Sequence, residues 1–366
     1  MAQEVRPRRG DDGPVTRHTD VVVVGGGQAG LAAGYHLRRR GLDFVILDAD
    51  PAPGGSWQHM WDSLHLFSPA DHSSLPGRLM PAQPGETYPD AGHVVDYLTD
   101  YEKRYDLPVQ HGTRVDAVRR DGERLLVEAD SGTWRARAAI SATGTWTRPF
   151  LPAVPGRDVF TGRQLHTVSY RSPADFAGQH VIVVGGGNSG AQIAADLALD
   201  GNVHVTWVTQ RPPRFLADDI DGRALFDVAT ARRRALEAGR TDTGGVASLG
   251  DIVAVPPVRA ARDAGLLTAK PMFAQFTATG VRWPDGSQSD AHAIVWCTGF
   301  RPALSQLAPL NLRGPRGHIP TDGTCAVGEP RLHLLGYGDW TGAASATLIG
   351  VGRPARDAVR HIAGLL

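Results

Sequence analysis

The 366-residue sequence lacks several features that mark common classes of protein. Its two cysteines, Cys297 and Cys325, give no disulfide framework, no Cys-x-x-Cys redox pair and no zinc-binding pattern. We therefore predict no metal site and a reducing compartment, the cytoplasm. No apolar run approaches the roughly 20 residues that cross a bilayer. Residues 1–20 are polar and lack the apolar segment of a secretory signal, so no contact with a membrane is expected.

The chain also lacks an excess of either charge, because 38 basic side chains are balanced by 38 acidic ones. Net charge therefore gives no reason to expect a nucleic acid partner. The 44 glycines follow no collagen period and form no low-complexity tract, which fits a loop-rich α/β enzyme. The length favours two domains over a single core, and nothing in the sequence indicates an oligomeric state.

Two glycine motifs of the form G-x-G-x-x-G lie 160 positions apart, at residues 25 and 185. Each follows a short β-branched strand and precedes a helix, as dinucleotide-binding fingerprints do. The glycines permit a tight turn, close approach of a pyrophosphate and packing of helix on strand, while the helix N-terminus favours the phosphates. We expect two dinucleotides to be bound by Gly25, Gly27, Gln28, Ala29 and Gly30, and by Gly185, Gly187, Asn188, Ser189 and Gly190.

The apolar pattern repeats one layout twice: a fingerprint, a small β unit and a buried strand ending in Thr-Gly. It predicts the α/β class, with two Rossmann-like dinucleotide-binding domains, one inserted in the other and each carrying a small β-meander. The expected boundaries are a flexible tail at 1–19, a first domain at 20–155 and 292–366, and an inserted domain at 156–291. The strands expected in the first meander are 114–118, 125–129 and 134–138, with a separate buried strand at 139–144.

The residues that follow each fingerprint indicate which dinucleotide it binds. An acid at the end of the next strand accepts hydrogen bonds from ribose hydroxyls and repels a 2′-phosphate. Asp48 holds that position after the first fingerprint, which favours FAD or NAD. The second fingerprint is followed by Thr209-Gln210-Arg211, without an acid, and a guanidinium binds phosphate through paired charge-assisted hydrogen bonds. This favours NADPH, unless Arg211 and Arg214 are only surface charges.

Near the chain end, an apolar strand at 332–335 runs through two glycines into Asp339. Because ligands bind at the carboxyl ends of parallel strands, Asp339 is expected to pair with a hydroxyl of a flavin's ribityl chain. The alternative is that Asp339 only begins a helix, which aspartate also favours.

Three segments together match one family: Gly54-Gly55-Ser56-Trp57, Ala142-Thr143-Gly144 and Phe160-x-Gly162-x-x-x-His166-x-x-x-Tyr170. In this order they resemble the flavin-containing monooxygenases that bind two dinucleotides, and the resemblance covers residues 20–366. Within that family, residues 336–353 resemble the bacterial arsenic-resistance flavin monooxygenases of the ArsO type. The resemblance implies FAD contacts from Ser56, Trp57, Val115 and Thr143. It leaves His166 either holding the link between domains or contacting NADP.

The resemblance implies that NADPH reduces FAD and that O2 then adds to give an oxygenating peroxyflavin. The implied substrate is a small soft nucleophile: a sulfide, an amine or a trivalent arsenical. One position departs from the family, because Phe67 stands where relatives carry an asparagine beside the flavin. Phenylalanine cannot form a hydrogen bond through its side chain, so Ser68 or His65 would have to supply the donor.

Two other functions remain open on the sequence alone. If neither donor acts, the protein would be an NADPH-dependent flavin reductase or oxidase that passes electrons to a quinone or O2. A disulfide reductase would need paired cysteines near the flavin, which Cys297 and Cys325 do not provide. A protein that senses NADPH without turnover would keep the fold but hold no flavin that NADPH can bleach. The aromatic run that includes Trp57, Trp61 and Phe67 forms either a substrate pocket or part of the core.

Overall fold

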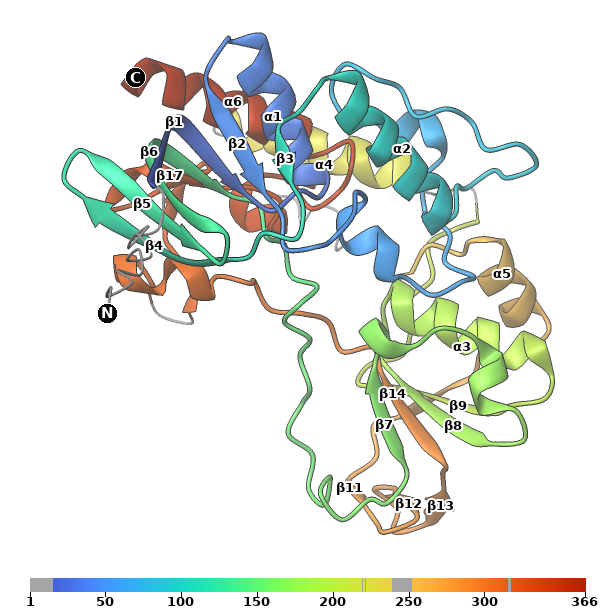
Figure 1. Ribbon diagram of the computed structural model, residues 1–366. Coiled ribbons are helices and arrows are strands. Elements are labelled where there is room, and N and C mark those ends of the chain that lie inside the picture. Colours follow the sequence, from blue (N-terminus) through green and yellow to red (C-terminus); the bar gives the residue numbers. More distant parts are fainter. Residues whose placement is uncertain (1–15, 219, 221, 239–251, 315–316) are drawn as a thin grey trace, which may run out of the picture.

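The computed structural model describes residues 16–218, 220, 222–238, 252–314 and 317–366, arranged as two α/β domains (Figure 1). The tail expected at 1–19 lies outside the described residues except for its last four. Those four belong to β1 (Thr16–Val24), which therefore begins earlier than expected. Among the described residues, no helix is long and apolar enough to span a membrane.

The first domain is built on a sheet whose middle strands are parallel, in the order β15-β16-β17-β6-β1-β2-β3. Residues 21–24 of β1 are at most 4% exposed, as expected of a strand covered on both faces. Helices α1 and α6 pack together on one face (Figure 1). The elements are β1, α1 (Gln28–Arg39), β2 (Phe44–Leu47), α2 (Ala91–Arg104), β3 (Val109–Gln110), β6 (Gly132–Ser141), β15 (Thr321–Asp322), β16 (Cys325–Ala326), β17 (Glu329–Leu334) and α6 (Gly352–Leu365).

The meander of the first domain consists of β4 (Val115–Asp121), β5 (Arg124–Ala129) and the start of β6. The separate strands expected at 134–138 and 139–144 are one strand. Residues 132–136 of β6 pair with β5, and β6 also runs beside β1 as far as Ser141. A single strand thus serves both the meander and the parallel sheet, which apolar periodicity alone does not reveal.

The inserted domain has a five-stranded parallel sheet in the order β10-β9-β8-β14-β7 and a separate three-stranded antiparallel sheet. Two Rossmann-like domains, each with a small antiparallel unit, confirm the predicted fold class. Its elements are β7 (Arg163–His166), β8 (His180–Val184), α3 (Asn188–Asp200), β9 (His204–Thr209), α4 (Gly222–Glu237), α5 (Pro256–Asp263), β10 (Ala269–Pro271), β11 (Gln275–Phe276), β12 (Gly280–Arg282), β13 (Gln288–Asp290) and β14 (Ala293–Trp296).

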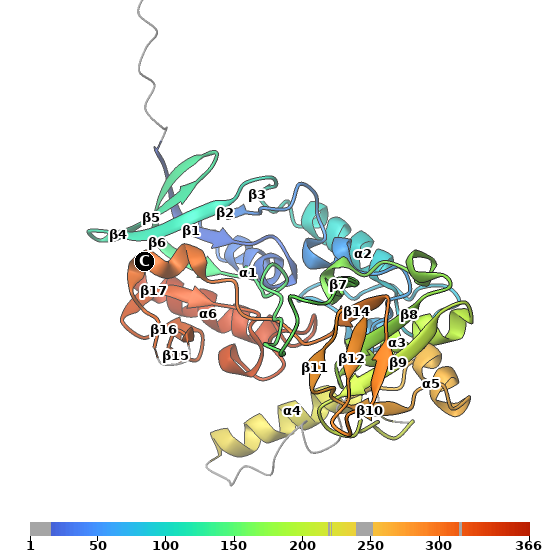
Figure 2. The same ribbon diagram turned by 90° about the horizontal axis from the view of Figure 1, so that it is seen from below.

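The chain returns to the first domain later than residue 291, the boundary expected from the sequence. β14 pairs with β7 and β8, so it belongs to the inserted domain. The two connecting segments then run side by side between the domains (Figure 2). Phe150 N donates to Gly299 O at 2.9 Å, and Arg301 N donates to Arg148 O at 2.8 Å. These hydrogen bonds join the two connecting segments into a paired link, which holds the two domains, and with them the two fingerprints, in position relative to each other.

Candidate functional site

A cavity of about 790 Å³ lies where the two domains meet, within the size range of small-molecule and cofactor sites. Both fingerprints reach it, the first by its glycine turn and the second by the start of α3. Of the residues predicted from the sequence, it brings together Gly25, Gly27, Gln28, Ala29, Asp48, Ser56, Trp57, His65, Val115, Thr143, Asn188 and Ser189. Gly30, Gly185, Gly187, Gly190, Thr209, Gln210 and Arg211 are not among its lining residues.

The first fingerprint turns tightly because of two glycines with different tasks. Gly25 has a φ of +105°, and a Cβ there would lie 2.6 Å from the carbonyl oxygen of Ala142. Gly27 instead borders open space, since the nearest atom to a Cβ would be Gly55 Cα at 3.9 Å. Backbone at Gly27 is therefore accessible to a ligand, as a pyrophosphate requires.

Asp48 follows β2 directly and is held on the cavity wall by two donors. Its Oδ1 accepts from Gly26 N at 3.0 Å, and its Oδ2 lies 3.2 Å from Nδ1 of His111. Burial raises the pKa of Asp48 above its usual range, and the hydrogen bonds from Gly26 and His111 oppose that shift. A carboxylate offers about four lone-pair sites, so acceptor capacity remains for ribose hydroxyls.

His111 was not predicted from the sequence, yet it fixes the orientation of Asp48. It follows β3, and its Nε2 lies 3.1 Å from both carboxylate oxygens of Glu102 on α2. The Glu102–His111–Asp48 chain thus links a helix to the end of β2. The three residues are up to 63 positions apart in the chain, and no local pattern signals their contact.

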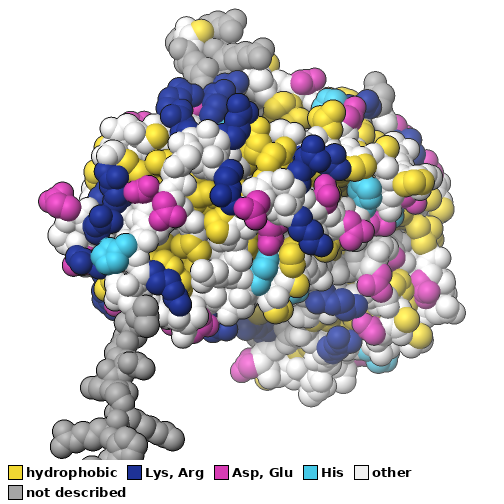
Figure 3. Space-filling view, turned by 45° about the horizontal axis from the view of Figure 1, so that its top comes forward, with side chains coloured by type: hydrophobic (Ala, Val, Ile, Leu, Met, Phe, Trp, Pro, Cys, Tyr) yellow, Lys and Arg dark blue, Asp and Glu magenta, His cyan; other side chains and the backbone are white. Residues whose placement is uncertain are grey.

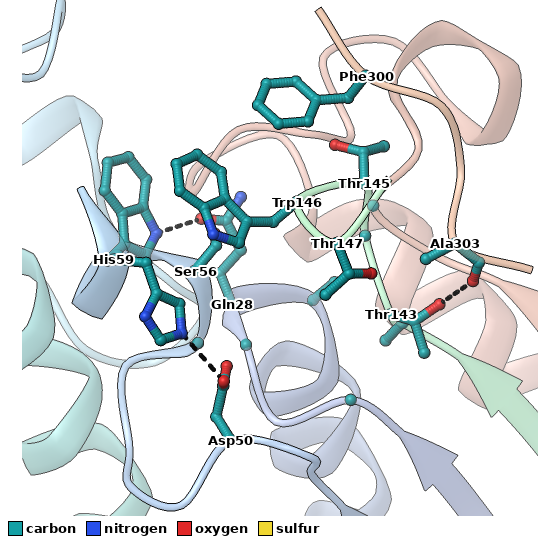
Figure 4. Close-up of a pocket in the computed structure, with 18 of the residues that line it drawn as sticks. Gln28, Asp50, Ser56, His59, Thr143, Thr145, Trp146, Thr147, Phe300 and Ala303 are labelled. Carbon is teal, nitrogen blue, oxygen red and sulfur yellow. Dashed lines mark hydrogen bonds and ion pairs between the residues drawn. The ribbon is translucent and has the colours of Figure 1, made fainter. Parts of the chain in front are cut away.

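Gln28 ties the first fingerprint to two other parts of the cavity wall (Figure 4). Its Oε1 accepts from Nε1 of Trp57 at 3.0 Å, and its Nε2 donates to Ala346 O at 2.7 Å. On the same rim, His59 Nε2 lies 3.0 Å from Oδ1 of Asp50. The Gly-Gly-Ser-Trp segment therefore lies against the first fingerprint, and its predicted contacts with FAD stay a prediction.

Thr143 anchors the start of the first connecting segment. Its Oγ1 donates to Ala303 O at 2.6 Å, across the pair of linkers (Figure 4). The hydroxyl of Tyr337 lies 2.8 Å from Oγ1 of Thr143. Above them, the rings of Trp146 and Phe300 stack at 5.4 Å between centroids and line the cavity.

His166 holds the link and is not a lining residue of the cavity. Its Nε2 lies 3.0 Å from Gly299 O, and its Nδ1 accepts from Val168 N at 3.4 Å. Burial lowers the pKa of His166, which favours the neutral ring that this pair of bonds needs. Of the two roles left open for His166, this geometry favours the structural one.

The second fingerprint repeats the geometry of the first. Gly185 has a φ of +149°, and a Cβ there would overlap the carbonyl of Cys297, just as Gly25 abuts Ala142. Gly187 borders open space, with no atom within 4 Å of a Cβ. Asn188 Oδ1 accepts from Val253 N at 2.9 Å, which fixes the first turn of α3 where it meets the cavity.

The discriminating positions of the two fingerprints are structurally equivalent. A Cβ on Gly26 would lie 2.8 Å from the carboxyl of Asp48, and one on Gly186 would lie 3.5 Å from the side chain of Thr209. Thr209 thus takes the place of the acid and carries no charge. Gln210 and Arg211 follow it and are exposed, so the guanidinium is accessible to a ligand at the end of β9.

Ser68 and Asp339, two further predicted residues, also do not line the cavity. Ser68 packs against Gly222 at the start of α4, and its Oγ lies 3.0 Å from Oγ of Ser73. Asp339 is exposed in the short helix η8 (Gly338–Thr341). The chain turns at Gly336, which itself lines the cavity, and Asp339 is carried away to the surface. Asp339 lies in the first turn of η8, whose N-cap is Tyr337, so it does not cap that helix, and its pairing with a ribityl hydroxyl stays a prediction.

The donors available near Phe67 differ from those expected. Phe67 and His65 both line the cavity, but both ring nitrogens of His65 already have partners. Nδ1 lies 3.0 Å from Ser63 O, and Nε2 lies 3.5 Å from Glu86 Oε2. Trp61, also on the cavity wall, is 2% exposed, and its Nε1 has no hydrogen-bond partner among the described residues. A buried N–H without a partner is costly unless a ligand satisfies it.

Comparisons with known proteins agree with this geometry. Residues 22–224 match the family described as pyridine nucleotide-disulphide oxidoreductase. The solved flavin-containing monooxygenase of Stenotrophomonas maltophilia is 51% identical, with a TM-score of 0.86 over 95% of this chain and 99% of that one. An uncharacterized CzcO-like oxidoreductase of Geobacillus kaustophilus is 30% identical over 94% of this chain and 98% of its own length. The indole-3-pyruvate monooxygenase YUCCA1 of rice is 28% identical over 76% of each chain.

Proposed function

Because the chain belongs to the pyridine nucleotide-disulphide oxidoreductase family, among its flavin monooxygenases, we propose that it oxygenates a small soft nucleophile in the cavity between its domains. It is an oxidoreductase that uses FAD and NADPH, with O2 and a small molecule as co-substrates. The observation that carries the proposal is the shared cavity, which both fingerprints reach. When bound, FAD supplies hydride acceptance and the activation of O2.

The residues of the first domain fit FAD. The accessible backbone at Gly27 would receive the pyrophosphate, and Asp48, held by Gly26 and His111, would accept from the ribose hydroxyls. Ser56, Trp57, Val115 and Thr143 line the same cavity and would enclose the rest of the cofactor.

The residues of the inserted domain fit NADPH. The open turn at Gly187 would receive its pyrophosphate, and Asn188 and Ser189 lead from that turn into the cavity. Thr209 and Gln210 would contact the adenosine ribose, and the exposed Arg211 would pair with its 2′-phosphate. The nicotinamide would then approach the first cofactor from the α3 side.

We propose Trp61 as the hydrogen-bond donor at the reacting oxygen. Phe67 has no donor, Ser68 is away from the cavity, and both nitrogens of His65 have partners, whereas Trp61 Nε1 has none among the described residues. Because Nε1 is itself buried, a small movement of the cavity wall on cofactor binding would have to bring it to that oxygen, where the N–H would stabilise developing negative charge. Its T-shaped contact with Tyr170, at 6.4 Å between centroids, holds the indole in place.

The cavity wall supports an uncharged or soft substrate. Aromatic and apolar side chains of the first domain and of the connecting segments line much of the cavity, including Trp57, Met60, Trp61, Phe67, Trp146 and Phe300. Such a wall binds through apolar contact and excludes water from the reaction. A thioether, a tertiary amine and a trivalent arsenical each meet this description, and the arsenical is the substrate that the ArsO-type resemblance favours.

The second candidate function is an NADPH oxidase or reductase without oxygenation, which the apolar Phe67 favours.

A disulfide reductase is a weaker alternative. Burial raises the pKa of Cys297 to about 12, so its thiol is not a nucleophile at neutral pH. Cys297 and Cys325 are both free thiols, which supports a reducing, cytoplasmic location.

The test is a coupling assay with three substrate classes: a dialkyl sulfide, a tertiary amine and a trivalent arsenical. NADPH consumption, oxygenated product and H2O2 are measured in the same reaction. We expect one class to accelerate NADPH consumption and to give nearly one product per NADPH with little H2O2. H2O2 equal to NADPH with every substrate would instead support the oxidase.

A further inference from the structure

A cluster of potential metal ligands lies in the first domain, apart from the cavity. Cys325 and His333 are cross-strand partners on β16 and β17, and His361 on α6 packs against them. The Cys325 thiol and one nitrogen from each histidine all lie within 4.8 Å of one another. His333 Nε2 and His361 Nδ1 are 3.0 Å apart. None of the three residues lines the cavity.

His333 is arranged as metal-binding histidines are. It is 1% exposed, and its Nδ1 lies 2.8 Å from Oγ1 of Thr324, which is itself buried. With Nδ1–H donating to that hydroxyl, the lone pair of Nε2 faces the other two residues. A second-shell acceptor on the remote ring nitrogen is a common feature of metal sites, because it fixes the tautomer and the ring plane. Burial lowers the pKa of His333 to about 4, so the ring is neutral at physiological pH.

We propose that Cys325, His333 and His361 bind a divalent metal ion of the Zn²⁺ class, with water in the fourth position. One thiolate and two imidazoles form a borderline-soft set that suits Zn²⁺ rather than Mg²⁺ or Ca²⁺. In a tetrahedral zinc site the ligand atoms lie roughly 3.3 to 3.6 Å apart. The separations in the cluster need only small rotations of the partly exposed Cys325 and the exposed His361.

Binding would release the thiol proton, because only the thiolate is a ligand. The pKa of Cys325 is raised by burial and by the nearby Asp322 and Glu329. Metal affinity at Cys325 should therefore increase with pH through the neutral range.

The ion would connect three elements that are distant in the sequence. It would link the β16–β17 pair to α6, which packs against α1 and so against the first fingerprint. Leu335 and Gly336, which follow β17, line the cavity. The site would therefore stabilise the C-terminal part of the first domain without taking part in the chemistry.

The spacings of 8 and 28 residues between the three ligands match no short zinc motif, which is why the sequence pointed to no metal.

The test uses untagged, flavin-loaded protein treated with chelator and desalted. Calorimetric titration with ZnCl2 should give one site per chain, and Zn²⁺ should raise the melting temperature. X-ray absorption at the zinc edge should report one sulfur at about 2.3 Å and nitrogen or oxygen ligands at about 2.0 Å. His361→Ala and Cys325→Ser should each weaken zinc binding at least 10-fold and remove the thermal shift.

Two variants serve as matched controls, with retained flavin absorbance as the check on folding. His18→Ala removes an exposed histidine outside the cluster, and Cys297→Ser removes the other thiol. Both should bind zinc as the parent protein does. The proposal would be overturned if His361→Ala and Cys325→Ser bound zinc as tightly as the controls, or if the zinc-edge spectrum showed no sulfur. Neither result would bear on the monooxygenase assay.

Discussion

In the proposed function, selectivity for the phosphorylated dinucleotide depends on Arg211. It is exposed at the end of β9, in the region where an acid would repel a 2′-phosphate. Arg211→Ala should raise the KM for NADPH roughly 10- to 100-fold, because a charge-assisted hydrogen bond is worth about 1.5 to 3 kcal/mol, and leave the KM for NADH nearly unchanged. Steady-state kinetics with both coenzymes measures this. Arg119→Ala, on the meander of the first domain, is the control, and equal effects on NADPH and NADH would remove Arg211 from this role.

In the proposed function, Trp61 supplies the hydrogen bond that favours oxygenation over release of H2O2. Trp61→Phe keeps the ring that packs against Tyr170 but removes the N–H. The rate of product formation should fall roughly 10- to 100-fold, with a matching rise in H2O2 per NADPH and little change in the KM for NADPH. Trp134→Phe, a buried tryptophan that does not line the cavity, is the control. Unchanged coupling in Trp61→Phe would assign the donor elsewhere.

Single residues were predictable where a local pattern determines the backbone. Asp48 and Thr209 lie at equivalent strand ends because each follows a fingerprint by a similar number of residues. Asp339 and Ser68 do not line the cavity, since a glycine turn or a contact with another element directs each side chain away, and their roles toward the flavin and the oxygen stay predictions. The roles given to His111 and Trp61 depend on their surroundings in the folded structure, which no local sequence pattern shows.

At the scale of elements, the two strand–turn–helix units should be separable by one substitution in each. Gly27→Trp would fill the space that a pyrophosphate needs, and Gly187→Trp would do the same in the inserted domain. Gly27→Trp protein should therefore be colourless. Gly187→Trp protein should be yellow, yet NADPH should not bleach its flavin under anaerobic conditions.

Absorbance spectra measure both outcomes, and circular dichroism checks that each variant is folded. Full flavin occupancy in Gly27→Trp, or bleaching of Gly187→Trp at the parent's NADPH concentration, would contradict the assignment of the two units. Each variant is the matched control of the other, since both place the same side chain at the same point of the motif.

The contact between α1 and α6 contains a histidine that acid should destabilise. Burial lowers the pKa of His36 to about 4, and the neighbouring Arg356, Arg39 and Arg40 add to the effect. Between pH 6.5 and pH 4 the unfolded chain binds a proton that the folded chain excludes, so stability falls as the pH falls. From pH 7 to pH 5 the loss from His36 should be about 1 to 2 kcal/mol.

Chemical denaturation at the two pH values measures this loss. His36→Gln should reduce the pH dependence, and the remaining part would include His333, whose pKa is lowered to about 4 in the same direction. An identical pH dependence in the parent and in His36→Gln would show that His36 titrates normally. Because His36 lies two turns along α1 from Ala29 and does not line the cavity, coenzyme kinetics at pH 7 give an independent check on the variant.

Elements were predicted well where one pattern governs a whole segment. α2 begins at Ala91 after Asp90, whose side chain accepts from His93 N, as aspartate commonly does at the start of a helix. β6 and β14 were harder, because each strand's partners decide which sheet it joins. β6 joins the meander to the parallel strands within one sheet, and β14 completes the sheet of the inserted domain, so the boundary at 291 came too early.

At the scale of the whole molecule, two repeated domains are joined by a paired link and share one cavity. The two fingerprints predicted the duplicated domains, but they did not predict that both domains border one cavity. That arrangement depends on how residues 144–150 and 299–303 pair. Basic and acidic side chains are interspersed on the face in Figure 3, in keeping with the balanced charge and a small-molecule substrate. The shared cavity is consistent with the proposed function, in which the inserted domain would hold the hydride donor and the first domain the flavin that receives the hydride.

The most direct test of this account is a turnover under ¹⁸O2 with NADPH and the best substrate from the coupling assay. Mass spectrometry of the product then reports where the oxygen goes. The account predicts one ¹⁸O atom in each product molecule, with product nearly equal to NADPH consumed. Unlabelled product, or label found only in H2O2 in amounts equal to NADPH, would contradict monooxygenation and leave the protein an NADPH oxidase.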